Sequence, residues 1–180
     1  MSFVSAGVEY GLHCLLYLTA EPRQAAAPSV RDLAELQGIP AEYLAKLFTK
    51  LSKAGLVVAT EGARGGFALA RSADEISFLD VVNAIDGDKP LFECREIRDR
   101  CAVFDSEAPA WATKGVCSIH AVMLAAEKSM KDELASHSLG ELAVQVAAKA
   151  PDDFTQQIAA WLDNRTANRR IAQLTHQSEE

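Results

Sequence analysis

Apolar and polar residues repeat with a helical period over most of the chain, which predicts a mainly α-helical protein with only a small β-hairpin. An apolar first helix is expected over residues 3–20, and a short helix over residues 29–38. The short helix has Ser29 as its N-cap and Gly38 as its stop signal, and a basic helix begins at Ala41. Two helices joined by a glycine-containing turn, the second one basic, predict a helix-turn-helix.

Two short β-strands follow the basic helix. Residues 56–59 (LVVA) and 67–70 (FALA) flank the turn EGARGG, whose glycines suit a tip that needs positive φ and close approach to a partner. Helix, strand, glycine-rich tip and strand predict a winged helix. Such a helix fits a DNA major groove, and the tip reaches the neighbouring backbone or minor groove. The alternative is an ordinary small α+β domain whose lysines only solvate a surface.

The charge distribution favours DNA binding by this one module. The chain carries a net charge of −7, but residues 29–71 hold six Lys or Arg against four Asp or Glu, so 6 − 4 = +2 and the remainder carries −9. A locally basic module in an acidic chain suits a site-specific dimer on a double-stranded operator better than a general coating protein. The candidate DNA-binding residues are Ser29, Ala41, Glu42, Tyr43, Lys46, Lys50, Arg64 and Gly65.

Further helices are expected in the second half of the chain. Ser77 caps a short helix, a long helix runs from Cys117 toward Ala135, Ser138 restarts a helix with a capping box, and Pro151 opens the last one. Residues between the short and the long helix show no clean periodicity and predict a loop. The expected division starts with a winged helix-turn-helix DNA-binding domain (residues 1–86) and a cysteine-bearing cluster loop (residues 87–117). Dimerisation helices (residues 118–150) and a C-terminal helical extension (residues 151–180) follow.

The long helix carries an apolar stripe at helical spacing. Its candidate interface residues are Ile119, Val122, Met123, Ala126 and Met130. The helix either packs back on its own core or pairs with a second copy. Because helix-turn-helix proteins usually read paired half-sites as two-fold dimers, a homodimer is favoured.

The chain shows no signal peptide and no apolar run near the ~20 residues of a membrane span. A cytoplasmic protein without a membrane partner is therefore expected. Four cysteines in such a chain favour reduced thiols, and hence metal or redox chemistry before structural disulfides. Cys14 lies within the apolar first helix, where it is expected to be buried packing.

Two sets of residues are candidates for a metal site. Cys94, Cys101 and Cys117 are followed by His120, three residues after the last cysteine and on the same helical face. Three thiolates and an imidazole complete a ligand set for a soft metal or an iron–sulfur centre. The second set is Glu9 and His13, an i, i+4 pair on the first helix that either shares one metal or forms only a polar helix edge.

A family resemblance covers roughly residues 1–135. The run LAELQGIPAEYLAKLFTKLSKAGLVVATEGARGGFALAR, then EISFLDVVNAIDG and the downstream cysteines, resembles the Rrf2 (IscR/NsrR/RirA-like) family of bacterial winged-helix regulators. The resemblance implies a homodimer with the winged helix on DNA and the long helix crossing its partner. In cluster-binding members, three loop cysteines hold an iron–sulfur centre near the interface, and Cys94, Cys101 and Cys117 match them in order.

The resemblance leaves two ligand models open. The stretch GVEYGLHC is similar to a redox-sensing branch that ligates a [2Fe–2S] cluster through a Glu and a His of the first helix, with the cysteines from the other subunit; Glu9 and His13 match these positions. In both models Cys101 and Cys117 are ligands. Either Glu9 and His13 complete the set, which is slightly favoured, or one chain supplies everything with Cys94 and His120. A [2Fe–2S] cluster is preferred over [4Fe–4S] because both sets offer non-thiolate ligands.

These patterns predict a homodimeric, sequence-specific transcriptional regulator that senses redox state, iron–sulfur status or nitric oxide through an iron–sulfur cluster. One alternative is a cluster-free regulator switched by thiol/disulfide chemistry or zinc. Another is an electron-transfer subunit, which the wing tip disfavours. The sequence offers no nucleophile–base constellation and no phosphate loop, so an enzyme is not expected.

Overall fold

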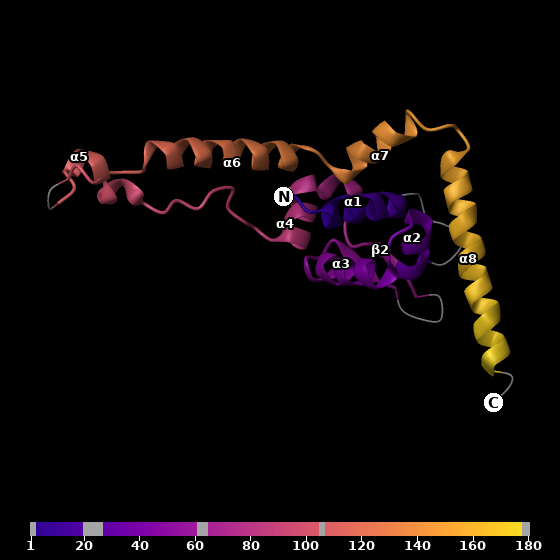
Figure 1. The fold of residues 1–180 in the computed structure, drawn as a ribbon. Helices are drawn as coiled ribbons and strands as arrows, with labels where there is room; N and C mark the ends of the chain where they lie inside the picture. The colour runs from indigo at the N-terminus through magenta and orange to yellow at the C-terminus, as the bar shows by residue number, and fades with distance from the viewer. Residues whose placement is uncertain (1–2, 20–26, 61–64, 105–106, 178–180) are drawn as a thin grey trace.

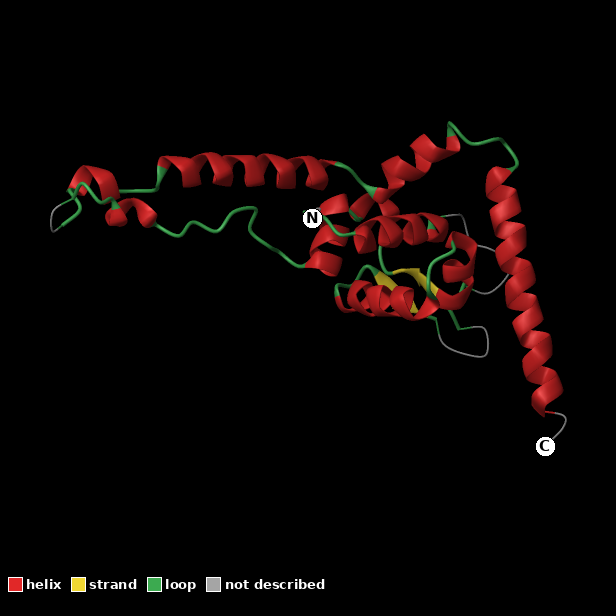
Figure 2. Cartoon of the chain, viewed as in Figure 1, coloured by secondary structure: helices red, strands yellow, loops and turns green. Residues whose placement is uncertain are grey.

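The computed structural model describes residues 3–19, 27–60, 65–104 and 107–177. The fold is mainly helical with one antiparallel hairpin, as predicted (Figures 1 and 2). Residues 61–64 of the predicted wing tip, including Arg64, lie outside the described residues. The elements in chain order are α1 (Ala6–Leu18), α2 (Val30–Gln37), α3 (Ala41–Lys53), β1 (Val57–Ala59), β2 (Phe67–Leu69), a 3₁₀ turn (Ala73–Glu75), α4 (Phe78–Asp86), a 3₁₀ turn (Ile97–Arg100), α5 (Ala110–Thr113), α6 (Ser118–Ser136), α7 (Leu139–Ala147) and α8 (Phe154–Gln177).

The predicted helix-turn-helix is formed by α2 and α3. The Oγ of Ser29 accepts a hydrogen bond from the backbone N–H of Asp32, and the Asp32 carboxylate accepts one from the N–H of Ser29 at 2.9 Å, which completes a capping box. Gly38 ends α2 with φ 66°, in the left-handed region where a side chain would be strained. The chain therefore turns at Gly38 and re-enters a helix three residues later.

One hydrophobic core lies between α1, the inner faces of α2 and α3, the hairpin and α4. Leu44, Phe48 and Leu51 of α3 are fully buried, and burial of each such side chain contributes about 1.5–3 kcal/mol. Cys14 is fully buried among them, which confirms the sequence-based expectation. Tyr43 follows the apolar pattern of α3 but remains 40% exposed, with its ring edge-on to Tyr10.

The hairpin is anchored to the segment that precedes α2. Val57 pairs with Leu69 and Ala59 with Phe67, and the N–H of Phe67 donates to the carbonyl of Pro28 at 2.9 Å. Gly66 approaches the carbonyl of Ala27 so closely that a Cβ at this position would overlap it. Glycine is therefore required at this base of the wing for close packing.

Beyond α4 the chain leaves the body and forms an extended arm (Figure 1). We define the arm as residues 88–104 and 107–130, which run outward from α4 and return along α6. Polar contacts join its two sides at the base: the ammonium of Lys131, just beyond the arm, meets carboxylate oxygens of Asp88 at 2.6 Å and Glu127 at 2.8 Å. The segment predicted as a loop also contains α5 and the 3₁₀ turn at Ile97–Arg100.

The second half of the chain returns to the body through α7 and α8. The capping box predicted at Ser138 is present, and the N–H of Leu139 donates to the carbonyl of Ile76 at 2.8 Å. The last helix begins at Phe154, later than the predicted start at Pro151, and buries Leu162 completely. None of the described helices is long and apolar enough to cross a membrane.

Candidate functional site

The exposed side of α3 is the candidate DNA-binding surface. Its buried residues all lie on the core side, so Glu42, Lys46 and Thr49 project to solvent. Lys46 is therefore free of the core, as a groove-contacting side chain must be. In Figure 1, α3 lies at the edge of the body opposite α1 and α7.

Lys50 has a different environment from Lys46. Its ammonium donates a 2.5 Å hydrogen bond to the carbonyl of Ile85, in the last turn of α4. A cation at a helix C-terminus satisfies an open carbonyl and interacts favourably with the helix dipole. Lys50 therefore has a structural contact that its sequence position did not predict.

The remaining candidate DNA-binding residues lie around α3. Ala41 is exposed at the first turn, and Ser29 is held in its capping box with a 2.7 Å contact from its Oγ to the Asp32 carboxylate. Gly65 is half-buried where the chain enters β2. The structure therefore brings most of the predicted residues to the ends and outer side of one helix-turn-helix.

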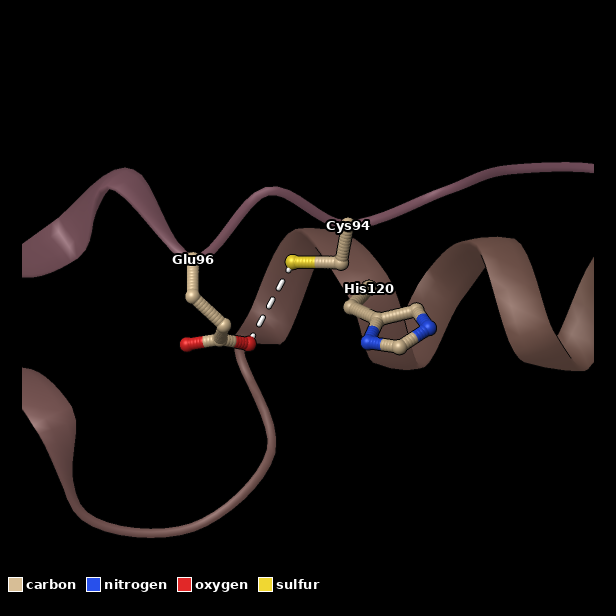
Figure 3. Close-up of side chains that lie close together, drawn as sticks. All are labelled: Cys94, Glu96 and His120. Carbon is tan, nitrogen blue, oxygen red and sulfur yellow. Dashed lines mark hydrogen bonds between the residues drawn. The ribbon is translucent and has the colours of Figure 1, made fainter.

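The candidate metal centre lies in the arm (Figure 3). One ligand atom each from Cys94, Glu96 and His120 lie within 4.8 Å of one another. The Cys94 thiol and the Glu96 carboxylate are 3.3 Å apart, and the His120 ring comes from the first turn of α6. Sequence reasoning missed Glu96; its only signal was a carboxylate two residues after a candidate cysteine.

Cys117 stands at the N-cap of α6 beside this cluster. The pKa of its thiol is lowered, first by hydrogen bonds from the backbone N–H groups of His120 and Ile119, and further by the positive charge of Arg98. A helix N-terminus stabilises a thiolate in this way. The thiolate form of Cys117, which is the form that binds metals, is therefore favoured.

The Cys94 thiol interacts electrostatically with Glu96, Arg98 and the Cys117 thiol. A backbone hydrogen bond from Glu96 lowers the Cys94 pKa, but partial burial, the Glu96 carboxylate and Cys117 together raise it. Arg98 donates to the Glu96 carboxylate at 3.1 and 2.5 Å and to the carbonyl of Gly115 at 3.0 Å. Arg98 therefore joins the outgoing and returning sides of the arm beside the two cysteines.

Cys101 does not join the Cys94–Glu96–His120 group. Its residue is exposed, at the end of the 3₁₀ turn Ile97–Arg100, whereas Cys94, Cys117 and His120 are half-buried. Within the described residues, the structure thus brings two of the four one-chain candidates, Cys94 and His120, into one group with an added carboxylate, and Cys117 interacts with Cys94 by charge.

Glu9 and His13 lie on α1, in the body, and both are exposed. They line an open groove of about 680 Å³ whose other lining is largely apolar, including Leu12, Phe78 and Leu142. The outer part of the arm lies well away from α1 (Figure 1). Within one chain, therefore, the first-helix pair and the cysteines do not meet.

The proposed interface stripe on α6 is open to solvent in the single chain. All residues of α6 are described, and none is buried. Ile119 and Val122 are 66% and 68% exposed, and Ala126 is exposed as well, whereas Met123 and Met130 are half-buried. Met130 lines a small hollow with Leu79 and Val82 of α4, so this end of the stripe partly contacts its own chain. The intrachain-core alternative thus applies only to the base of α6.

A helix-turn-helix with an attached hairpin, an exposed basic helix and a thiol-bearing arm define a winged-helix DNA-binding regulator. A family model described as "Rrf2: Iron-dependent Transcriptional regulator" matches residues 4–145, and the chain belongs to the Rrf2 family. The protein rrf2 of Nitratidesulfovibrio vulgaris is 33% identical over 133 residues, which cover 74% of this chain and 81% of that protein.

Other relatives are regulators too. The HTH-type transcriptional regulator IscR of Aliivibrio salmonicida is 30% identical over 164 residues, 91% of this chain and 89% of that protein. The structure of CymR, the global cysteine regulator of B. subtilis, aligns with a TM-score of 0.59 at 25% identity, covering 81% of this chain and 98% of that one. IscR of T. potens shares the fold with a TM-score of 0.60 at 23% identity, covering 83% of this chain and 92% of that one.

Proposed function

We propose that this DNA-binding regulator is a homodimer that senses redox state, iron–sulfur status or nitric oxide through an iron–sulfur cluster. The observation that carries the proposal is the group of Cys94, Glu96 and His120, whose ligand atoms lie within 4.8 Å of one another, with the Cys117 thiol at the N-cap of α6 interacting with Cys94 by charge. A thiol-rich site on an arm with little core of its own is suited to respond to a ligand.

Cys94 and Cys117 are the thiolate ligands that the geometry supports best. Both thiols interact by charge with Glu96 and with Arg98, and the Cys117 charge raises the pKa of Cys94. Two thiolates close enough to repel each other are stabilised when a cation binds between them. Cys101, which the sequence favoured, is exposed at the end of the 3₁₀ turn and is outside the Cys94–Glu96–His120 group.

The partner's first helix is proposed to supply the other two ligands, Glu9 and His13. They lie one helical turn apart and face a largely apolar groove, while the arm exposes apolar residues such as Trp111 and Ile119 at 80% and 66%. An arm lying in the partner's groove would bury both surfaces and bring both ligand pairs together. The Glu96 carboxylate is less available as a ligand because Arg98 already neutralises it.

The donor set fits a [2Fe–2S] centre, since thiolate, imidazole and carboxylate ligands are all present. When bound, such a cluster would supply one-electron redox chemistry and reactivity toward nitric oxide. Packing contacts connect the ligand Cys117 to the DNA-binding helix. Cys117 is the N-cap of α6, the base of α6 packs against α4, and α4 packs on α3. A change in the ligation of Cys117 therefore alters the start of α6, and in a dimer it shifts the spacing of the two α3 helices. A few kcal/mol of coupling would suffice.

The ligand assignment is tested by anaerobic absorption spectra with iron and sulfide counts. Cys94→Ser, Cys117→Ser and the Glu9→Ala/His13→Ala double variant should each lose or recolour the cluster. Cys101→Ser is the matched control and should keep it. Loss on His120→Ala with an intact spectrum in the double variant would instead favour ligation within one chain.

A zinc or thiol-switched regulator is the second candidate, because the Cys94, Glu96 and His120 atoms within 4.8 Å of one another also suit a single divalent metal. Purification under anaerobic conditions separates the two candidates. A colourless protein with stoichiometric zinc, and without sulfide, would replace the cluster by a mononuclear site.

A further inference from the structure

A separate cavity lies beside the groove that Glu9 and His13 line. It measures about 380 Å³ and is formed between α1, the end of α7 and the start of α8. Cavities that bind small organic molecules typically measure ~300–1,000 Å³, so this one has the size of a ligand site. In Figure 1, α7 and α8 lie on the side of the body opposite the outer part of the arm. The cavity is therefore distinct from the candidate metal centre in the arm.

Much of this cavity is built by residues that follow the family-matched segment, which ends at residue 145. Val146 and Ala150 line it from the end of α7 and the segment after that helix, and Phe154 and Ile158 line it from α8. The C-terminal extension thus supplies a wall opposite α1. The cavity is accordingly a feature of this chain beyond the matched part of the family fold.

The lining of the cavity is mostly apolar, with a few hydroxyl groups. Tyr17 and Thr19 supply two of them from the end of α1, and Thr155 supplies a third from α8. Partial burial raises the pKa of the Tyr17 hydroxyl, which therefore stays uncharged. No Asp, Glu, Lys or Arg is among the described residues that line the cavity. Because a buried charge needs a partner, this lining suits an uncharged molecule with an apolar body and one hydrogen-bonding end.

Two walls of the cavity also contact the helix-turn-helix. The Tyr17 hydroxyl of α1 accepts a hydrogen bond from the side-chain amide of Gln37, the last residue of α2. On α8, the guanidinium of Arg165 forms an ion pair with Glu35 of α2 and lies 5.6 Å from the centre of the Trp161 ring. A molecule bound between α1 and α8 would therefore contact two helices that are both bonded to α2. Its binding would favour one position of α2 over others.

We propose that this cavity binds a small, uncharged, largely apolar molecule with one hydroxyl-type end, and that its occupancy changes the affinity of the protein for its operator. The inference rests on DNA binding by the helix-turn-helix, and is independent of the proposed iron–sulfur cluster. Tyr17 and Thr19 are assigned to the hydrogen-bonding end of the ligand. His13, which also lines the cavity, is already proposed as a cluster ligand.

The first test measures binding of 2-naphthol, which joins an apolar ring system to one hydroxyl. Equilibrium dialysis with the wild type should show saturable binding. Ala143→Trp places a ring in the cavity and should bind 2-naphthol roughly tenfold more weakly or worse, and Ala143→Leu should have a smaller effect in the same direction. Naphthalene-2-sulfonate should bind the wild type more weakly than 2-naphthol, because its charge would lack a partner.

Val144→Trp is the matched control. Val144 is the next residue of α7, is 70% exposed and is not among the residues that line the cavity. The variant adds the same ring to the same helix, but outside the cavity. It should bind 2-naphthol like the wild type.

The second test measures operator affinity with and without saturating 2-naphthol, on a duplex recovered by selection from genomic fragments. The affinity of the wild type and of Val144→Trp should change by roughly fivefold or more, the lower end of typical couplings, and that of Ala143→Trp should stay constant. Failure of DNA binding itself would show in the ligand-free protein, whereas failure of this proposal shows only when 2-naphthol is added.

Three outcomes would overturn the proposal. One is the absence of saturable binding by the wild type. The second is equal binding by the wild type and by a folded Ala143→Trp protein, with Ala143→Leu deciding the point if the tryptophan variant does not fold. The third is saturable binding that leaves operator affinity unchanged.

Discussion

The thiols of Cys14 and Cys117 differ in pKa because one is buried in the core and the other lies at a helix N-terminus. Burial raises the pKa of the Cys14 thiol to about 12, whereas backbone N–H groups of α6 lower the pKa of the Cys117 thiol. Thiolates are the form that ligates metals and reacts, so Cys117 is suited to ligation and Cys14 is not. The sequence predicted that Cys14 is buried and is not a ligand, because it lies in an apolar helix.

The buried Cys14 thiol predicts a pH dependence of stability. The unfolded thiol titrates near its usual pKa of 9.0, and the folded one near about 12. Below pH 9 both states are protonated, so the stabilising effect is complete; as pH rises from 9 toward 12, only the unfolded state loses its proton, and the free energy of unfolding falls. The expected decline is about 1.4 kcal/mol per pH unit.

The measurement is urea unfolding between pH 7 and 10.5, with Cys14→Ala as the comparison. The variant is less stable at pH 7 because it loses packing, but it lacks this titration, so the difference between the two proteins should shrink above pH 9. A constant difference across the whole range would contradict a buried neutral thiol.

Single residues also show where sequence reasoning stops. Lys46 and Lys50 are alike in sequence, four residues apart on the same helix, yet only Lys50 donates to the Ile85 carbonyl. That contact depends on how α4 crosses α3, which no local pattern contains. Glu96 was missed for the same reason, because its closeness to His120 joins the two sides of the arm.

At the scale of elements, local signals fixed most helix starts. The capping boxes at Ser29, Ser77 and Ser138 are all present, because the serine and the acid three residues later interact within one turn. The short α5 and the 3₁₀ turn of the arm were missed, since helices of four residues show no period.

The exposed face of α6 predicts a dimer that a single charge can break. Val122 is 68% exposed in the single chain, so Val122→Glu should leave the monomer folded and remove the apolar contact with a twin helix. Sedimentation velocity should show a monomer with little specific DNA affinity. Lys128→Gln has the same change in charge about 120° around the helix and should remain dimeric. A dimeric Val122→Glu protein would place the interface elsewhere.

At the scale of the whole molecule, the sequence predicted the parts better than their arrangement. The winged helix, the long helix and the final helix are all present, and the family is confirmed. The separation of the arm from α1, and the contact of α8 with α2 through Arg165 and Glu35, arise from tertiary packing between distant segments. The separation matters most for function, because the proposed ligand set of α1 and the arm would then require two chains.

The central claim is that ligation in the arm controls DNA affinity through α6. The direct measurement is the operator affinity of one anaerobic preparation, before and after removal of the cluster, with Cys117→Ser treated identically. We expect the affinity of the wild type to change by roughly 5- to 150-fold, the range of a typical coupling free energy, and that of Cys117→Ser to stay constant. Equal affinities of the wild type with and without its cluster, at full iron and sulfide occupancy beforehand, would contradict the claim.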